Sequence, residues 1–293
     1  MRKAELTIAL VSFKTPRLLE DCIRSIHRYT RGLNFIIYVV DNGSLDGTSE
    51  MVKGKFPRIK LITNNKNRFA TTGFNQILKI TKTPFVLVLS PDVEFLDNAI
   101  LKMLNFCKKH SQVAAVSCRQ IDAKGDVDKT CSRFSTPIIE ILNSSIIARF
   151  LKNSKLLSKY KYGSWRRDST RRVEVIGDTI LLAKTQVLKE VGFYDENMKL
   201  FFMENDLCLR IKNARYSVWH MGSVTVKHLR GQSTLKFSPK QMYKIIEADM
   251  LYYYKKHFGI WWWIFLYCVY RLSRLYWSFE PLWALVRPKP SIK

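Results

Sequence analysis

The feature that most constrains the fold is an apolar, β-branched and aromatic run at residues 35–40 that ends at an acidic residue, Asp41. Such a run predicts a buried β-strand, and the small polar residues after it predict a loop. A second run, at residues 85–89, is followed in the same way by an acidic turn that contains Asp92. In open α/β sheets, ligands bind just beyond the carboxyl ends of the strands. The two acidic loops therefore predict a site for a polar ligand together with a divalent cation.

Strand-like and helix-like segments alternate along the first 117 residues. The first helix is expected to run from Pro16 to about Tyr29, with Thr15 as N-cap and proline at the first helical position. This β-α-β-α order predicts an α/β fold with a mainly parallel sheet and right-handed crossovers. The expected strands are residues 6–13, 34–41, 59–64, 85–89 and 113–117, and the further helices are residues 48–53, 71–82 and 97–109.

Residues 133–172 are less regular. Residues 150–172 are rich in Lys and Arg, and they predict either a mobile, basic insertion beside the site or a surface loop without a role. The expected strands are residues 173–177, 180–183 and 224–226, and the expected helices are residues 185–191, 206–214 and 239–258. We expect one domain over residues 1–237, made of two halves (1–118 and 119–237), followed by a helical C-terminal segment (238–293).

An excess of basic residues is the main compositional signal, because 49 Lys and Arg against 24 Asp and Glu give a net charge of +25. This excess favours nucleic acid, anionic lipid or a phosphorylated substrate as partner. The chain carries no RNA-binding or helix-turn-helix signature, and the acidic strand-end loops would repel nucleic-acid phosphates without a metal. We therefore expect no nucleic-acid partner.

Six cysteines are scattered without paired spacing, so neither a zinc pattern nor a disulfide framework is expected. The N-terminus leads straight into a strand-like run without a cleavage site for a signal peptide. Both features predict a reducing, cytoplasmic setting.

The C-terminal part differs in character from the rest. Residues 260–270 are uncharged and aromatic-rich, but a membrane-spanning helix needs about 20 apolar residues. Tryptophans close to basic residues predict an amphipathic helix, or a helical pair, lying on an anionic membrane surface. We expect a peripheral protein on the inner face of the cell membrane. The alternative is a helix packed onto the core or into a homodimer.

Six motifs, in order over roughly residues 5–235, resemble the family 2 glycosyltransferases of the GT-A fold, in particular the rhamnosyltransferase-like enzymes of bacterial surface polysaccharides. The resembling segments are residues 10–13, 41–48, 67–75, 90–92, 192–210 and 228–233. The resemblance implies an inverting transfer from a nucleotide sugar, either dTDP-rhamnose or a UDP-sugar. The implied acceptor is a lipid-linked or growing surface glycan, such as O-antigen, lipopolysaccharide or capsule.

The resemblance also implies roles for individual residues. The acceptor would lie at Gly177 and Asp178, the divalent cation (Mg²⁺ or Mn²⁺) at Asp92 and His228, and the catalytic residues would be Glu204 and Asp206. Of the last two, Glu204 is the expected base, and Asp206 could instead orient the site as a helix N-cap. The residues implied for the nucleotide are Ser12, Phe13, Asp41, Asn42, Ser44, Asn67, Phe69, Gly73, Asn75, Ser90, Pro91 and Asp92.

These roles suit the chemistry of glycosyl transfer. A departing diphosphate develops negative charge that a cation bound by carboxylates can neutralise. Inversion needs a base that takes the proton of the acceptor hydroxyl. Three residues depart from the family pattern: Ser90 in the metal turn, Met203 in the acidic motif, and Asp178 at a position where a small residue is common. Ser90 and Met203 leave an inactive, glycosyltransferase-like scaffold as an alternative.

Overall fold

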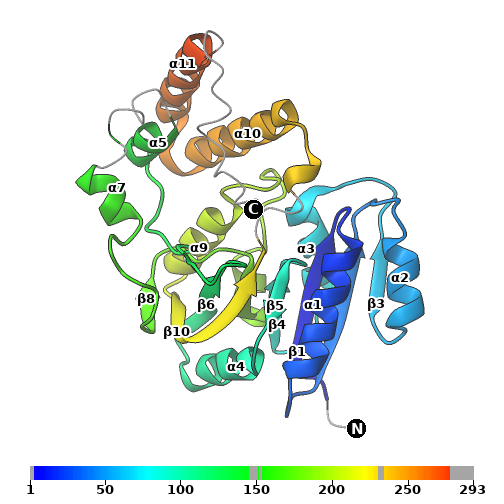
Figure 1. Cartoon of the computed structure of the whole chain (residues 1–293). Helices are drawn as coiled ribbons and strands as arrows, with labels where there is room; N and C mark the ends of the chain where they lie inside the picture. Colours follow the sequence, from blue (N-terminus) through cyan, green and yellow to red (C-terminus); the bar gives the residue numbers. More distant parts are fainter. Residues whose placement is uncertain (1–2, 145–150, 152–153, 230–233, 278–293) are drawn as a thin grey trace.

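The computed structural model describes residues 3–144, 151, 154–229 and 234–277. Within these ranges a ten-stranded sheet runs through the molecule, in the order β3-β2-β1-β4-β9-β6-β10-β5, with β7 on β6 and β8 on β10 (Figure 1). The strands are β1 Leu6–Ser12, β2 Phe35–Asp41, β3 Lys60–Thr63, β4 Phe85–Leu89, β5 Val93–Phe95, β6 Val113–Ile121, β7 Val127–Asp128, β8 Arg171–Val173, β9 Ile180–Lys184 and β10 Ser217–His228.

Helices cover the sheet, and its two faces carry separate apolar clusters. The helices are α1 Pro16–Tyr29, α2 Thr48–Lys55, α3 Phe69–Ile80, α4 Ala99–Lys109, α5 Pro137–Ser144, α7 Lys155–Tyr160, α8 Thr185–Glu190, α9 Met203–Asn213, the 3₁₀ turn η1 Thr234–Lys236, α10 Pro239–Phe258 and α11 Ile260–Trp277. None of the helices in the described ranges is long and apolar enough to cross a membrane.

The first four strands form the expected parallel sheet, with Ser12 beside Asp41 at the ends of β1 and β2. Residues 113–117 lie in β6, which runs in the same direction as the first four strands, as expected, but does not pair with β4 directly. β9 lies between β4 and β6 and is antiparallel to both, with Ile180 beside Leu89 and Leu182 beside Val116. β9 is buried along almost its whole length, which suits a strand at the centre of a sheet. The α/β architecture is confirmed, but the sheet is mixed beyond β4.

Several helix and strand boundaries differ from those expected from the sequence. α9 begins at Met203, so Asp206 lies inside its first turn, and the expected role of Asp206 as N-cap is wrong because Phe202 occupies that position. Thr15 lies at the N-cap of α1, but its hydroxyl contacts Ser12 Oγ at 3.1 Å rather than a helix N–H. The short strand expected at residues 224–226 is the end of β10, which is irregular between Met221 and Thr225.

The expectation of a mobile insertion at residues 150–172 is wrong for its described part. This part contains α7 and β8, and the side chain of Arg167 is fully buried. The Arg167 guanidinium donates to the carbonyls of Cys131, Lys161 and Trp165. Residues 150, 152 and 153 lie outside the described residues.

The C-terminal helix α10 packs into the core of the domain. Met250, Tyr253 and Tyr254 are fully buried in the same cluster as Val88 of β4. α11 packs onto α10 and α5, and these three helices gather at one end of the molecule (Figure 1). The expected boundary between residues 237 and 238 thus divides α10 from the core that it helps to form. The six cysteines are free thiols.

Candidate active site

A pocket of about 200 Å³ opens where β1, β2 and β4 end, as expected for a parallel sheet. Six of the residues expected to bind nucleotide line it, together with Asp178 from the loop before β9. Phe237 also lines the pocket, with its ring 6.1 Å from that of Phe69 and 5.7 Å from that of Phe13. No signal in the sequence indicated Phe237. The six expected residues are Phe13, Asn42, Asn67, Phe69, Ser90 and Pro91.

Buried polar groups hold the two loops that follow β1 and β2. The Asp41 carboxylate accepts from the backbone N–H of Ser44 at 3.1 Å and from Ser49 Oγ at 2.6 Å. Ser44 Oγ in turn accepts from the backbone N–H of Lys14 at 3.0 Å. Asp41 and Ser44 therefore shape the rim of the pocket, and neither lines it.

An amide pair fixes the next turn of the pocket. Asn42 Nδ2 donates to Asn67 Oδ1 at 3.0 Å, and Asn42 Oδ1 accepts from the backbone N–H of Arg68 at 3.0 Å. Asn67 Oδ1 also accepts from the backbone N–H of Phe69 at 2.8 Å. Phe69 has φ = 62°, a strained conformation that persists where surrounding contacts impose it. These bonds aim the Phe69 ring into the pocket.

Gly73 and Asn75 lie on the inner side of α3, away from the pocket lining. A Cβ at Gly73 would lie 2.8 Å from Val11 Cγ1, so glycine lets α3 pack closely on β1. The Asn75 amide donates to the carbonyl of Tyr194 at 2.8 Å and accepts from the N–H of the same residue at 3.1 Å. Both residues support the site rather than line it.

Asp92 and His228 meet beside the pocket. Asp92 is 5% exposed, and its Oδ1 accepts from Ser90 Oγ at 2.6 Å and lies 3.4 Å from His228 Nε2. His228 Nδ1 lies 3.7 Å from Asp128 Oδ2, a neighbour that sequence reasoning missed. Burial alone would lower the pKa of His228, but Asp128 and Asp92 outweigh it and raise the pKa to about 9.

The residues present fit a cation site that substrate completes. Among the described residues, no three His, Cys, Asp or Glu side chains converge on one point that could hold a metal ion. Mg²⁺ is commonly bound by one or two carboxylates plus substrate phosphates and water. Asp92 and His228 supply such a partial set. Glu94 pairs with Lys227 at 3.3 Å and is a partly solvated strand charge.

Glu204 lies in the first turn of α9, and Asp178 follows Gly177 in the loop before β9. The N–H of Ser90 donates to the carbonyl of Thr179 at 2.8 Å, which joins this loop to the Asp92 turn. Burial, together with the nearby charge of Asp178, raises the pKa of Glu204 to about 7. Burial and the charge of Asp92 raise the pKa of Asp178 to about 6.

Comparison with known proteins identifies the family. A model of the glycosyl transferase family 2 matches residues 7–173, more than half of the chain. The chain is a family 2 glycosyltransferase. It is 20% identical over 237 residues to N-acetylglucosaminyl-diphospho-decaprenol L-rhamnosyltransferase of Mycobacterium tuberculosis, a match that covers 77% of this chain and 76% of the relative. The expected resemblance to rhamnosyltransferases is thus confirmed.

Solved structures confirm the expected GT-A fold of this glycosyltransferase. The mannosyltransferase PcManGT of Pyrobaculum calidifontis, in complex with GDP-Man and Mn²⁺, has a TM-score of 0.53 at 12% identity and covers 94% of this chain and 76% of its own. GalNAc-T7 with UDP, GalNAc and Mn²⁺ has a TM-score of 0.57 at 14% identity and covers 86% of this chain and 50% of its own.

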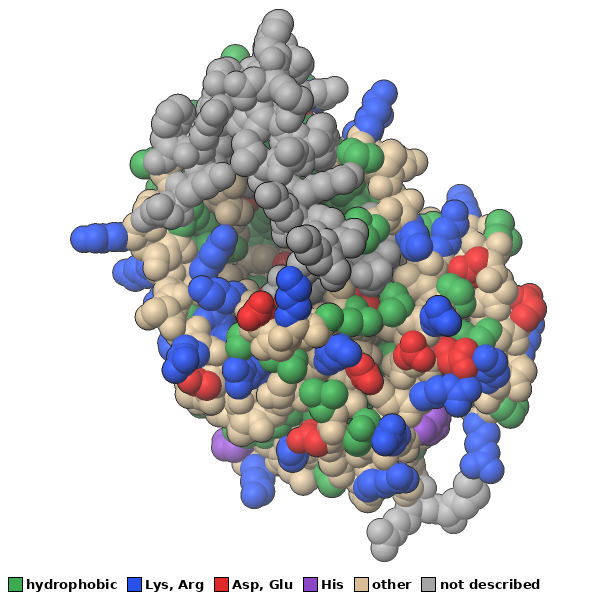
Figure 2. Space-filling model, viewed as in Figure 1, with side chains coloured by type: hydrophobic (Ala, Val, Ile, Leu, Met, Phe, Trp, Pro, Cys, Tyr) green, Lys and Arg blue, Asp and Glu red, His purple; other side chains and the backbone are tan. Residues whose placement is uncertain are grey.

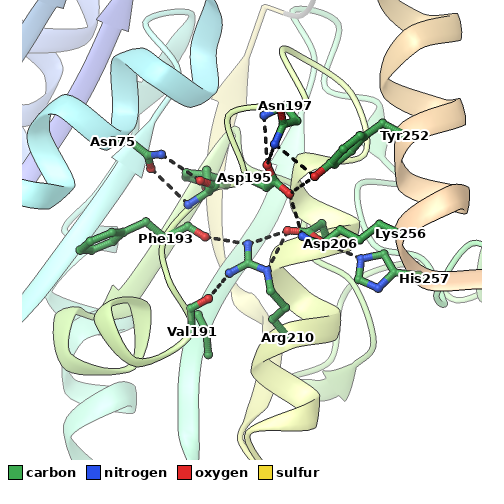
Figure 3. Close-up of polar contacts among 11 residues, drawn as sticks. Asn75, Val191, Phe193, Asp195, Asn197, Asp206, Arg210, Tyr252, Lys256 and His257 are labelled. Atoms are coloured by element: carbon green, nitrogen blue, oxygen red, sulfur yellow. Dashed lines mark hydrogen bonds and ion pairs between the residues drawn. The ribbon is translucent and has the colours of Figure 1, made fainter.

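Basic side chains surround the Asp206 carboxylate of the glycosyltransferase (Figure 3). Its carboxylate accepts from Arg210 at 2.6 Å and from Lys256 at 2.6 Å, and it lies 2.8 Å from His257 Nε2. Burial alone would raise its pKa, but His257 and the two cations hold the pKa of Asp206 well below its usual range. Lys256 also donates to Asp195 at 2.8 Å, so α10 is fastened to α9 and to the preceding loop. These contacts join α9 to α10 through the Asp206 carboxylate.

Hydrogen bonds connect Glu204 of the glycosyltransferase to its C-terminal helices. Asn205 Nδ2 donates to Glu204 Oε1 at 3.3 Å, and Asn205 Oδ1 accepts from the N–H of Ser135 at 3.3 Å. The Ser135 hydroxyl contacts Tyr254 Oη of α10 at 2.7 Å. Further hydrogen bonds connect Tyr254 to α5 and α11. There, the buried carboxylate of Glu140 accepts from Tyr254 Oη at 3.3 Å and from Tyr270 Oη at 2.9 Å.

Proposed function

We propose that the glycosyltransferase moves a sugar, with inversion, from a nucleotide-sugar donor to a lipid-linked or growing surface glycan. The observation that carries this proposal is the strand-end pocket, which is lined by six of the residues expected to bind nucleotide and by Asp178. The hydrogen bond from the N–H of Ser90 to the carbonyl of Thr179, at 2.8 Å, joins the Asp178 loop to the Asp92 turn. Besides burial, the charge of Asp178 raises the pKa of Glu204. This arrangement lets a donor, a cation and an acceptor meet.

In the proposed reaction, Glu204 accepts the proton of an acceptor hydroxyl while the hydroxyl oxygen attacks the anomeric carbon. The bond between that carbon and the diphosphate oxygen breaks on the opposite face, and the nucleoside diphosphate leaves. A pKa near 7 suits a base that works near neutral pH. A divalent cation at Asp92 and His228 would neutralise charge on the departing diphosphate.

The name of the mycobacterial relative supports rhamnose as the transferred sugar and a lipid-diphosphate acceptor for this chain, and the two structures with Mn²⁺ support a divalent cation. Thermal shifts against dTDP-, UDP- and GDP-sugars, with and without Mn²⁺, test the donor, because a ligand of the folded state raises its stability. We expect the largest shift with dTDP-rhamnose. Failure to bind any nucleotide sugar would remove the enzymatic proposal and leave the inactive scaffold.

We expect Asp92→Ala to lower turnover by about 10²–10³-fold at unchanged folding, because it removes a ligand of the charge-neutralising cation. Glu94→Ala is the matched control, since Glu94 lies on the same strand segment and pairs only at the surface. The measurement is donor turnover with added Mn²⁺ and after EDTA treatment. Wild-type turnover in EDTA would rule out the metal site.

We further propose peripheral binding to the inner face of the cell membrane through α11. One side of this helix is buried at Leu266 and Tyr270, while Trp261 is 79% exposed and Phe265 is 49% exposed. Figure 2 shows Lys and Arg side chains spread over much of this face of the molecule, in keeping with the net charge of +25. A basic residue close to an anionic surface contributes roughly 1 kcal/mol.

Substitution of the exposed side of α11 tests this membrane binding without disturbing its buried side. We expect the double variant Trp261→Ala/Phe265→Ala to pellet less with phosphatidylglycerol vesicles than the wild type. Ile80→Ala is the control, because Ile80 is a comparably exposed apolar residue, at 48%, on α3. Equal pelleting of all three proteins would place the membrane contact elsewhere.

A further inference from the structure

A second pocket, of about 330 Å³, lies between β8, the start of β10 and the second half of α9. It shares no lining residue with the pocket at the strand ends. Part of its lining comes from the basic segment 154–172 and from β8, for which the proposed transfer reaction gives no role. The basic and aromatic residues that line it are Arg133, Phe134, Tyr162, Arg171, Arg172, Lys212 and Tyr216.

Positive charge in this pocket is not balanced by protein. Its one carboxylate, Glu174, is already engaged, because it accepts from Arg133 Nη1 at 2.9 Å and from the N–H of Phe134 at 2.9 Å. Within the described ranges, Arg171, Arg172 and Lys212 form no ion pair with a carboxylate. The three residues are exposed, so their cationic groups can meet an anion from solution without giving up an ion-pair partner.

Aromatic rings hold two of these cations in place. The Arg171 guanidinium lies 5.0 Å from the ring of Tyr162 and 4.7 Å from the ring of Trp165, which pack edge to face. Lys212 Nζ lies 4.9 Å from the ring of Phe134. Stacking occupies the faces of a guanidinium and leaves its N–H edge free for a planar pair of oxygen acceptors. Such preorganised edges bind phosphate with two parallel hydrogen bonds.

We propose that this pocket, named the arginine pocket, binds a phosphate group of a ligand. A phosphate or diphosphate carries enough negative charge to compensate Arg171, Arg172 and Lys212, which a single carboxylate would not. Glu204, Cys208 and Ile211 share one face of α9, and a helix rises 1.5 Å per residue. Along the helix axis, Cys208 therefore lies roughly 6 Å and Ile211 roughly 10 Å from the proposed base. If the proposed function holds, this placement favours the phosphate group of the acceptor as the ligand. A phospholipid headgroup would offer the same chemistry.

Inorganic pyrophosphate is the probe, titrated into the full chain by calorimetry in EDTA so that the strand-end pocket lacks a divalent cation. We expect Arg172→Ala/Lys212→Ala to weaken binding about 10- to 100-fold, as expected for lost charge-assisted contacts. Lys53→Ala/Arg58→Ala removes the same charge from exposed sites on the far side of the sheet and should bind as the wild type does. Arg171→Lys keeps the charge but loses the two parallel N–H donors of the guanidinium, and this variant should bind pyrophosphate more weakly than the wild type.

Equal affinity of the wild type and Arg172→Ala/Lys212→Ala, or an equal loss in the control pair, overturns the proposal. The source of the phosphate is separated by two assays on the same variant. A raised KM for a lipid-diphosphate acceptor with unchanged vesicle pelleting indicates the acceptor, and the reverse result indicates a lipid headgroup. The wild type could also show no transferase activity while Arg172→Ala/Lys212→Ala still binds pyrophosphate more weakly than the wild type. That result would overturn only the proposed function and would support the arginine pocket.

Discussion

Glu204→Gln should lower turnover by about 10²–10⁴-fold, the usual cost of losing a positioned general base. The substitution keeps the size of the side chain and its contact with Asn205, but an amide cannot accept the proton of the acceptor hydroxyl. Affinity for the donor should be unchanged, because the strand-end pocket is lined by other residues. Steady-state turnover and donor thermal shift, measured on the same preparation, check both halves of this result.

The pH profile gives an independent test of the same residue. Because the pKa of Glu204 is about 7, the wild-type kcat/KM should rise with pH until the carboxylate is formed and then level off. In Glu204→Gln this rise should vanish. Glu190→Gln, the same change on the surface at the end of α8, should retain the wild-type profile. A full rise in Glu204→Gln would assign the base to another group.

Asp206→Asn should destabilise the folded protein by about 3–5 kcal/mol, the usual cost of breaking a buried ion pair from one side. The carboxylate is fully buried, and its loss leaves Arg210 and Lys256 without their shared partner. Urea unfolding gives the change in free energy. Asp97→Asn, which breaks an exposed ion pair with Lys102, should cost no more than about 1 kcal/mol. Similar losses in the two variants would contradict the structural role of Asp206.

The two carboxyl groups of α9 should change stability in opposite directions with pH. The pKa of Asp206 is lowered by folding, so its contribution is present above about pH 4 and is lost as the pH falls toward its folded pKa. The pKa of Glu204 is raised to about 7, so the folded state loses stability as the pH rises from about 4.5 to 7. At pH 8, Glu204→Gln should therefore unfold at higher urea than the wild type, although it turns over more slowly.

The strand ends could be predicted from the sequence because each is set by local pattern. The apolar run before Asp41 fixes a buried strand, and the Asp41 carboxylate finds its hydrogen-bond partners within eight positions, at Ser44 and Ser49. The same holds for Asp92 and Ser90. The strand-end pocket therefore brought together side chains that the sequence had already picked out.

Partners distant along the chain could not be predicted in this way. Lys256 and His257 lie about fifty positions after Asp206, and nothing near Asp206 indicates that they neutralise it. Arg167 reads as one more surface charge in a basic segment, yet three carbonyls hold it in the interior. Local pattern identifies that a residue is charged, whereas its burial depends on which segments come to surround it.

The position of β9 has a consequence for the order in which the chain folds during synthesis. β4 and β6 are complete by residue 121, but both need β9 to cover the edges that face each other. Until residue 184 has left the ribosome, two hydrophobic strands carry unpaired edges, the kind of surface that pairs with other chains. A fragment that stops at residue 118 should therefore aggregate, however complete its nucleotide loops are, and the first half of the sheet becomes a stable unit only after most of the second half has been made.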